Sequence, residues 1–183
     1  MRKYLLRILI GLLALALIAA PLFASQPHFT ATFSLGSLIA NGDVAGLGTQ
    51  DVNVILTASG VPQVICQNQG GNQAPGQNPP RVSATGTDFL PGNSALRKNG
   101  KAPYSDEAKW NNNQTLIAPG SQWGCPNDNW TAYVGPFVFW DTANIIVTDT
   151  STPPTTLAAQ KYRCVTTAAT STQPASVSCT PVP

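Results

Sequence analysis

Short runs of β-branched and aromatic residues, separated by Gly, Pro and Asn, constrain the fold of this chain most strongly. Residues 28–33 (HFTATF) and 51–59 (DVNVILTAS) alternate apolar with polar side chains, which is typical of half-buried strands. Gly60 separates the second run from residues 61–66, its expected hairpin partner. Asn41-Gly42 is the strongest hairpin-turn signal in the chain. The first half therefore predicts hairpins of short antiparallel strands.

The second half is expected to supply the central strands. Residues 130–134, 137–140 and 145–148 are apolar without strict alternation, which favours strands buried on both faces. Residues 81–89 predict a thinner edge strand, and residues 105–110 (SDEAKW) form the only short window with helical character. The whole pattern predicts an all-β fold, an antiparallel β-sandwich with Greek-key-like connections and about nine or ten short strands, with a β-barrel as the alternative.

Residues 1–24 have the features of a secretory signal peptide, because three basic residues precede an uncharged apolar segment over residues 8–20. Cleavage is expected after Ala24. Retention as a membrane anchor is the alternative, since the segment is almost long enough to cross a bilayer.

Cleavage would remove three of the ten basic residues and none of the eight acidic ones, which leaves 7 against 8 and a net charge of −1. The basic pI of the whole chain therefore does not indicate nucleic acid as a partner. The remaining 159 residues (183 − 24) fit one domain. We expect a β-sandwich over residues 25–150 and a disulfide-stapled hairpin extension over residues 151–183, packed on the same domain.

All four cysteines lie in the part expected to be exported, where two disulfides are the simplest arrangement. Of three possible connectivities we favour Cys164–Cys179, because two strand-like segments, KYRCV and ASVSC, flank the polar residues 166–173. That choice leaves Cys66–Cys125. A metal site at the cysteines is disfavoured, because there is no C-x-x-C spacing and the only histidine, His28, lies near the expected new N-terminus.

Residues 67–80 contain only Gln, Asn, Gly, Pro and one Ala, so this stretch cannot bury an apolar face. Cys66 anchors one end, and the turn-forming residues predict a fixed path for the backbone, an ordered loop and not a linker. We regard it as a structured loop whose key positions are Asn68, Gly70, Gly71, Asn72, Pro75, Gly76, Asn78 and Pro79.

Catalytic signatures are missing from the sequence: it has one imidazole and no G-x-S-x-G nucleophile elbow. We therefore predict a protein that is not an enzyme. The remaining catalytic hypothesis is glycoside hydrolysis by a carboxylate pair drawn from Asp88, Asp106, Glu107, Asp128 and Asp141. No cofactor is predicted. Ca²⁺ near Asn41, Asp43 and Asp51 is a weaker alternative, because no D-x-D-x-D-G pattern is present.

Aromatic side chains offer one candidate ligand platform, formed by Trp110, Trp123, Trp130 and Tyr133, whose rings could stack on sugars. Core packing is the favoured alternative, with Trp123 and Trp130 covering a disulfide at Cys125. Sequons at Asn113 and Asn129 matter only in a glycosylating host.

Three segments together resemble a family of exported proteins of unknown function. They are GLGTQDVNVILTASG at residues 46–60, CQNQGGNQAPGQNP at residues 66–79, and CPNDNW at residues 125–130. The resemblance covers about residues 30–148 and implies that Cys66 and Cys125 form the family's pair. It implies no activity. The tail over residues 151–183 departs from the family pattern.

These observations predict an exported, non-catalytic β-sandwich that acts outside the cell or at its surface as a structural or interaction module, with self-association as one form of that role. The expected partners are itself, another surface protein or a polysaccharide, and neither nucleic acid nor, after signal cleavage, a membrane. A carbohydrate-binding module is the alternative function, and a glycoside hydrolase is the third.

Overall fold

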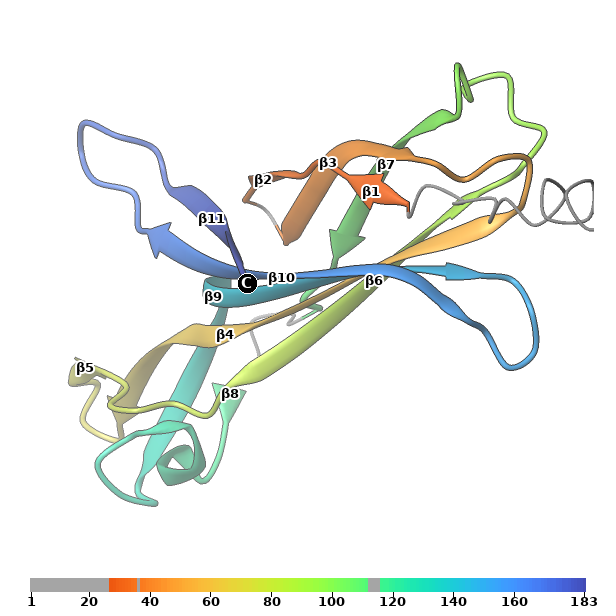
Figure 1. Cartoon of the computed structure of the whole chain (residues 1–183). Coiled ribbons are helices and arrows are strands. Elements are labelled where there is room, and N and C mark those ends of the chain that lie inside the picture. The colour runs from red at the N-terminus through yellow and green to blue at the C-terminus, as the bar shows by residue number, and fades with distance from the viewer. Residues whose placement is uncertain (1–26, 36, 112–115) are drawn as a thin grey trace, which may run out of the picture.

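The computed structural model describes residues 27–35, 37–111 and 116–183, and within these ranges the regular structure is almost entirely β (Figure 1). The predicted signal peptide and the sequon at Asn113 lie outside the described residues. The elements in chain order are β1 (His28–Phe29), β2 (Thr32–Ser34), β3 (Leu38–Ala45), β4 (Val52–Asn68), β5 (Gln73–Pro75), β6 (Val82–Leu90), β7 (Lys101–Ala108), β8 (Leu116–Ile117), the 3₁₀ turn η1 (Gly120–Trp123), β9 (Trp130–Asp149), β10 (Thr156–Thr167) and β11 (Ser176–Val182).

Two antiparallel sheets form the sandwich. In sheet A the central strand β3 pairs with β1 and β2 along one edge and with β7 along the other. Sheet B has the order β11-β10-β9-β4, after which β6 and β5 pair with successive parts of β4, and β8 pairs with β9. Sheet A covers only part of sheet B, and the long strands β4 and β9 continue past it (Figure 1). The predicted all-β fold with two disulfides is confirmed.

The prediction that the strands are all short is wrong for two of them. Residues 51–59 and 61–66 do not form a hairpin, because β4 is one strand of 17 residues. Its register with β9 shifts at Ser59/Gly60, where a Cβ on Gly60 would lie only 2.8 Å from the Cα of Trp140. Gly60 therefore permits a close crossing inside a continuous strand and does not end it. The three apolar runs of the second half likewise merge into β9, a strand of 20 residues.

Two further local predictions are wrong for the same reason, that tertiary packing overrides local propensity. Asn41-Gly42 is not a hairpin turn but lies inside β3, where the missing side chain of Gly42 admits the Thr30 carbonyl of the neighbouring segment. The SDEAKW segment is not helical. Its first four residues belong to β7, whose residues alternate between exposed and buried, so that Tyr104 and Asp106 point into the sandwich.

The main core lies between the two sheets and the distal core lies beyond them. The main core includes Leu38, Val44, Leu56, Trp140 and Ile145, each at most 1% exposed. The smaller distal core consists of Val64, Cys66, Cys125, Ala132 and Val134, with Ile117, Trp123 and Trp130 packed against it. A register irregularity between Pro62 and Val64 separates the two, so the far half of the β4–β9 pair forms a lobe of its own.

Both predicted disulfides are present. Cys66–Cys125 joins the end of β4 to the loop after η1 across 59 residues, and Cys164–Cys179 joins directly paired positions of β10 and β11. The C-terminal hairpin is part of sheet B, because β10 pairs with β9 from Thr156 to Arg163. In the described part of the chain, no helix has the length and apolar character needed to span a bilayer.

Candidate functional site in the distal lobe

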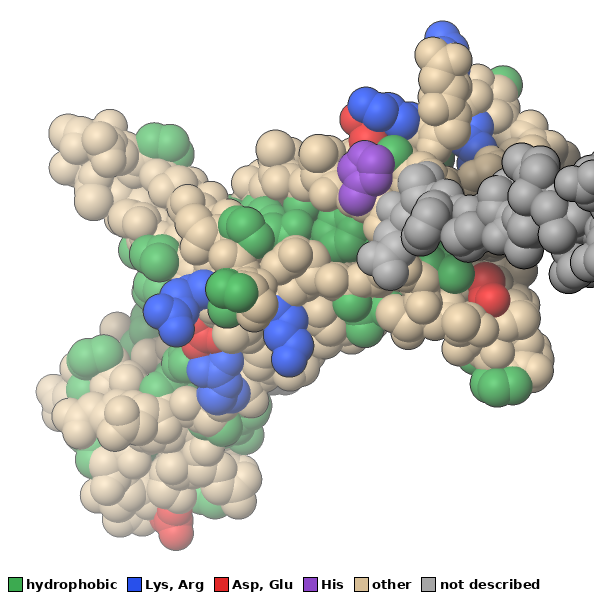
Figure 2. All heavy atoms as spheres, viewed as in Figure 1, with side chains coloured by type: hydrophobic (Ala, Val, Ile, Leu, Met, Phe, Trp, Pro, Cys, Tyr) green, Lys and Arg blue, Asp and Glu red, His purple; other side chains and the backbone are tan. Residues whose placement is uncertain are grey.

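The distal lobe, which we define as residues 64–80 and 116–134, differs chemically from the rest of the molecule. It holds ten Asn and Gln residues but only one charged residue, Asp128. Figure 2 shows the lobe at the lower left as a mostly uncoloured polar surface with apolar patches and a single acidic side chain. Such a surface presents hydrogen-bond donors and acceptors without a strong electrostatic field.

Backbone hydrogen bonds fix the path of the Gln/Asn/Gly/Pro-rich loop. The Asn68 N–H donates to the Asn72 carbonyl (3.1 Å), while the Asn68 side-chain oxygen accepts from the Asn72 N–H (2.9 Å). Gly76 N–H then donates to Val64 O (2.9 Å) and Gln77 N–H to Gly124 O (2.7 Å). The loop is therefore a short hairpin, β4–β5, whose return strand is tied to the turn beside Cys125.

Two glycines and one asparagine explain why this backbone path needs its particular sequence. Gly71 has φ +79° and Gly124 has φ +82°, in the left-handed region where glycine costs least. A Cβ on Gly124 would also collide with the backbone of Gln77. Asn78 adopts φ +51°, which asparagine tolerates better than most residues do. Pro75 ends β5, and Pro79 follows in the segment that leads to β6.

A cleft of about 400 Å³ opens on one side of the lobe between the β4–β5 turn and the loop before β9. Its lining residues are Asn68, Gln69, Gly70, Asn127, Asn129 and Trp130. The loop wall is ordered, since the Asn127 side chain accepts from the Asn129 N–H (3.0 Å) and the Asn127 carbonyl from the Trp130 N–H (3.2 Å). Trp130 is half-buried and forms the aromatic wall.

A second cleft of about 540 Å³ lies between residues 77–80 and 121–126. It is lined mainly by polar groups, among them Gln77, Asn78, Ser121 and Gln122, and the Ser121 hydroxyl donates to Asp128. The Cys66–Cys125 disulfide ties together the segments that carry the two clefts. Amides and hydroxyls on rigid loops, next to an aromatic face, form the chemical surroundings that hydroxyl-rich ligands require.

The four rings proposed as a platform are not brought onto one surface. Trp110 packs against the main core, whereas Trp130 packs against the distal core and Trp123 contacts both. Tyr133 pairs in register with Ile65, whose side chain is exposed, and so lies on the strand face opposite Ala132 and Val134. Of the four rings, Trp130 is the one that lines the cleft next to the β4–β5 turn. Trp123 and Trp130 both pack against the distal core, which contains Cys66 and Cys125.

Four of the five carboxylates suggested for glycoside hydrolysis accept hydrogen bonds from other groups of the fold, and Asp88 lies close enough to Asp106 for its charge to affect the pKa of Asp106. Asp88 accepts from Ser105 N–H (3.0 Å), and Asp106 from Leu56 N–H (2.8 Å). Burial, opposed by that Leu56 bond and aided by the charge of Asp88, raises the pKa of Asp106 to about 6. Hydrogen bonding to Arg81 lowers the pKa of Asp141. Asp128 is far along the chain and binds Ser121.

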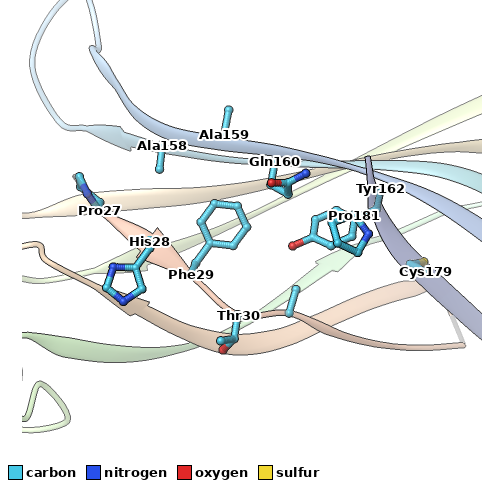
Figure 3. Close-up of a pocket in the computed structure, with 11 residues that line it drawn as sticks. Pro27, His28, Phe29, Thr30, Ala158, Ala159, Gln160, Tyr162, Cys179 and Pro181 are labelled. Carbon is cyan, nitrogen blue, oxygen red and sulfur yellow. The ribbon is translucent and has the colours of Figure 1, made fainter. Parts of the chain in front are cut away.

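Two further features are the acidic groups that could bind a metal ion and a hollow between the sheets. Among the described residues, no group of three or more His, Cys, Asp or Glu side chains could hold a metal ion. A hollow of about 510 Å³ lies between β1 and the β10–β11 hairpin, with the Phe29 ring extending between the sheets toward Gln160 and Tyr162 (Figure 3). The Gln160 amide already donates to the carbonyls of Lys161 (2.9 Å) and Val182 (2.7 Å).

The fold and the lobe together define a class: a disulfide-stapled β-sandwich with an uncharged, amide-rich lobe at one end. The chain matches no protein-family model, no curated protein and no solved structure at a significant level. The predicted resemblance to a family of exported proteins therefore stays a prediction that depends on the three quoted segments.

Proposed function

We propose that this protein is an exported, non-catalytic interaction module and that the distal lobe is its binding end, with neutral glycans as the ligand class. The observation that carries the proposal is the cleft beside Trp130, where three asparagines, Gln69 and the backbone of Gly70 surround one aromatic face without any charged lining residue. Two disulfides suit an oxidising compartment, which supports export.

The physical reasoning for a neutral glycan comes from the balance of groups in the cleft. A sugar ring offers hydroxyls that both donate and accept, which matches side-chain amides, and apolar C–H faces that pack on an indole ring. An anionic or cationic ligand would need a countercharge to offset its desolvation. The lobe has only Asp128, which Ser121 already contacts.

Two side chains provide a direct test, because Gln69 and Asn129 line the cleft and their side chains form no hydrogen bond with other residues in the described part of the chain. The mature protein is titrated with soluble neutral polysaccharides while tryptophan emission is recorded. Binding should be weaker by about tenfold in Q69A/N129A, while the matched double variant Q50A/Q173A, with exposed amides outside the lobe, should bind as the wild type. Equal affinities in all three proteins, or no binding of any neutral glycan, would contradict the proposal.

Self-association is a second candidate role, favoured by the exposed apolar side chains at one end of sheet B. Val165 on β10 is 64% exposed and Val182 on β11 is 37% exposed, and within the described residues no strand pairs with the outer edge of β11. Sedimentation velocity should show a concentration-dependent oligomer that V165K abolishes. A monomer at all concentrations would count against this role.

A further inference from the structure

The outer face of sheet B carries another hollow, which is bordered by positive charge, whereas the distal lobe has a single acidic residue and no basic one. It has a volume of about 410 Å³ and extends across four neighbouring strands, β4, β9, β10 and β11. Its lining residues include Thr57, Ser59, Thr142 and Asn144 together with Ala58, Ala143, Tyr162 and Val182, and Lys161 and Arg163 border it on β10.

The register of the strands aligns the key groups in one row across the sheet. Asn144 on β9 is paired with Thr57 on β4 and with Lys161 on β10, and the adjacent row contains Ser59, Thr142 and Arg163. Because residues two apart on a strand face the same side, these two rows form a continuous polar surface. In each row β4 contributes a hydroxyl, β9 an amide or a hydroxyl, and β10 a cation.

One polar atom in this row has no hydrogen-bond partner among the residues that the structure describes. The side-chain oxygen of Asn144 is buried from solvent, yet none of these residues donates a hydrogen bond to it. A buried acceptor without a donor costs about 1–3 kcal/mol, and such a group is an exception that calls for an explanation. Asn144 lines the hollow, so a rotation of its side chain can bring this oxygen to the surface of the hollow, where a ligand hydroxyl that donates to it would remove the cost.

The charge around the hollow is positive. Lys161 and Arg163 lie on β10, and Arg81, which immediately precedes β6, already pairs with Asp141 on β9. Figure 2 shows this group of Lys and Arg side chains around one acidic side chain where β10 crosses the middle of the view. Lys161 and Arg163 therefore remain as two cations with no ion-pair partner among the described residues.

We propose that this face binds an acidic polysaccharide whose carboxylates contact Lys161 and Arg163 and whose hydroxyl donates to the Asn144 side-chain oxygen. The ligand must supply both anions and hydroxyl donors on an extended scaffold, and a uronate polymer does so. Its sugar rings can lie on the floor formed by Thr57, Ser59 and Thr142, which are short enough to allow a close approach. An acidic membrane is the less suitable partner, because the residues of β9 and β4 in the same rows as Lys161 and Arg163 are short and polar, whereas lipid insertion needs large apolar side chains.

The test uses polygalacturonate and its fully methyl-esterified form, which has the same backbone without the charge, measured by isothermal titration calorimetry on the mature protein. The charged polymer should bind with an affinity that falls as salt rises, and the esterified polymer should bind at least about tenfold more weakly. K161Q/R163Q should lose about tenfold in affinity. K98Q/K101Q removes the same charge from a distant loop and should bind as the wild type.

A second variant separates binding from folding. N144A removes the unpaired oxygen, so its thermal stability should equal or exceed that of the wild type, while its affinity for polygalacturonate falls several-fold. Equal weakening by K98Q/K101Q would show non-specific charge attraction and overturn the site. Unchanged binding by N144A, or binding to phosphatidylglycerol vesicles without any binding to polygalacturonate, would overturn it as well. Failure of the neutral-glycan proposal would not affect the proposal for this site, because Gln69 and Asn129 lie in the distal lobe and not on this face of sheet B.

Discussion

Replacing Asp106 by Asn should change how the stability of this protein depends on pH. Asp106 is 3% exposed, extends from β7 across Gly86 and accepts the Leu56 N–H of the opposite sheet at 2.8 Å. Burial raises its pKa from 3.8 to about 6, and the nearby charge of Asp88 contributes in the same direction. The folded protein therefore holds this proton more tightly than the unfolded chain does.

The sign of the effect follows from that difference. Because the folded-state pKa lies above the unfolded value, the contribution of Asp106 to stability is complete below pH 3.8 and is lost as pH rises to about 6. A rise from 3.8 to about 6 corresponds to about 3 kcal/mol, since each pH unit is worth about 1.4 kcal/mol. Asn at this position does not titrate, and its side-chain oxygen can still accept the Leu56 N–H.

Urea denaturation followed by circular dichroism at pH 4 and pH 7.5 measures the effect in D106N and the wild type. The free energy of unfolding of D106N minus that of the wild type should be larger at pH 7.5 than at pH 4 by about 2–3 kcal/mol. Subtracting the wild type at each pH cancels the contributions of other groups, such as Asp141 and Asp149, whose pKa values are lowered. D43N, at an exposed position of β3, serves as the control. A difference between D106N and the wild type that is the same at both pH values would refute the reasoning.

Three further predictions concern the two disulfides, the close contact at Gly86 and the Arg81–Asp141 ion pair. C66A/C125A should lower the free energy of unfolding in urea by about 4 kcal/mol and C164A/C179A by about 3 kcal/mol, because the closed segments span 59 and 15 residues. Only C66A/C125A should make the distal lobe sensitive to limited proteolysis. Equal cleavage of both variants would contradict the role of Cys66–Cys125 in that lobe. G86A should lower the free energy of unfolding by about 2 kcal/mol, since the new Cβ would lie 2.6 Å from the Glu107 carbonyl carbon and force β7 to shift. T85A, at an exposed position on the same strand, is the control. Equal thermal midpoints for G86A and T85A would argue against close contact between β6 and β7. D141N should cost less than about 1 kcal/mol at pH 7 despite its ion pair, because both side chains are about half exposed (52% and 41%); a loss above about 2 kcal/mol in the same denaturation assay would indicate a buried role.

The distal lobe illustrates how far local sequence carries a prediction of a site. Its boundaries follow from the amide-rich composition of residues 67–80 and from the cysteine at each end of the disulfide, both visible in the sequence. The cleft is a different matter. It forms only because the β4–β5 turn meets the loop before β9 across about 60 residues of chain, and no local pattern specifies which of four tryptophans lines it.

Asn144 and Lys161 show the same limit on the other face. Nothing in the run NIIVTD or in the segment AAQKYR suggests that these two residues are neighbours, because the strand register that pairs them is set by packing of the two sheets. The unpaired oxygen of Asn144 is likewise a property of its surroundings, not of its residue type.

The all-β class and the two disulfide pairs were predictable from the sequence, because alternation and turn residues act over short distances and four cysteines allow only three connectivities. Where strands continue through apparent breaks depends instead on tertiary packing. Gly60 and Gly42 are turn signals locally, yet each lies inside a strand at a place where another backbone approaches too closely for a side chain. SDEAKW carries a helix-start signal, but alternate residues of β7 face the main core, and the burial of Tyr104 and Ala108 outweighs local propensity.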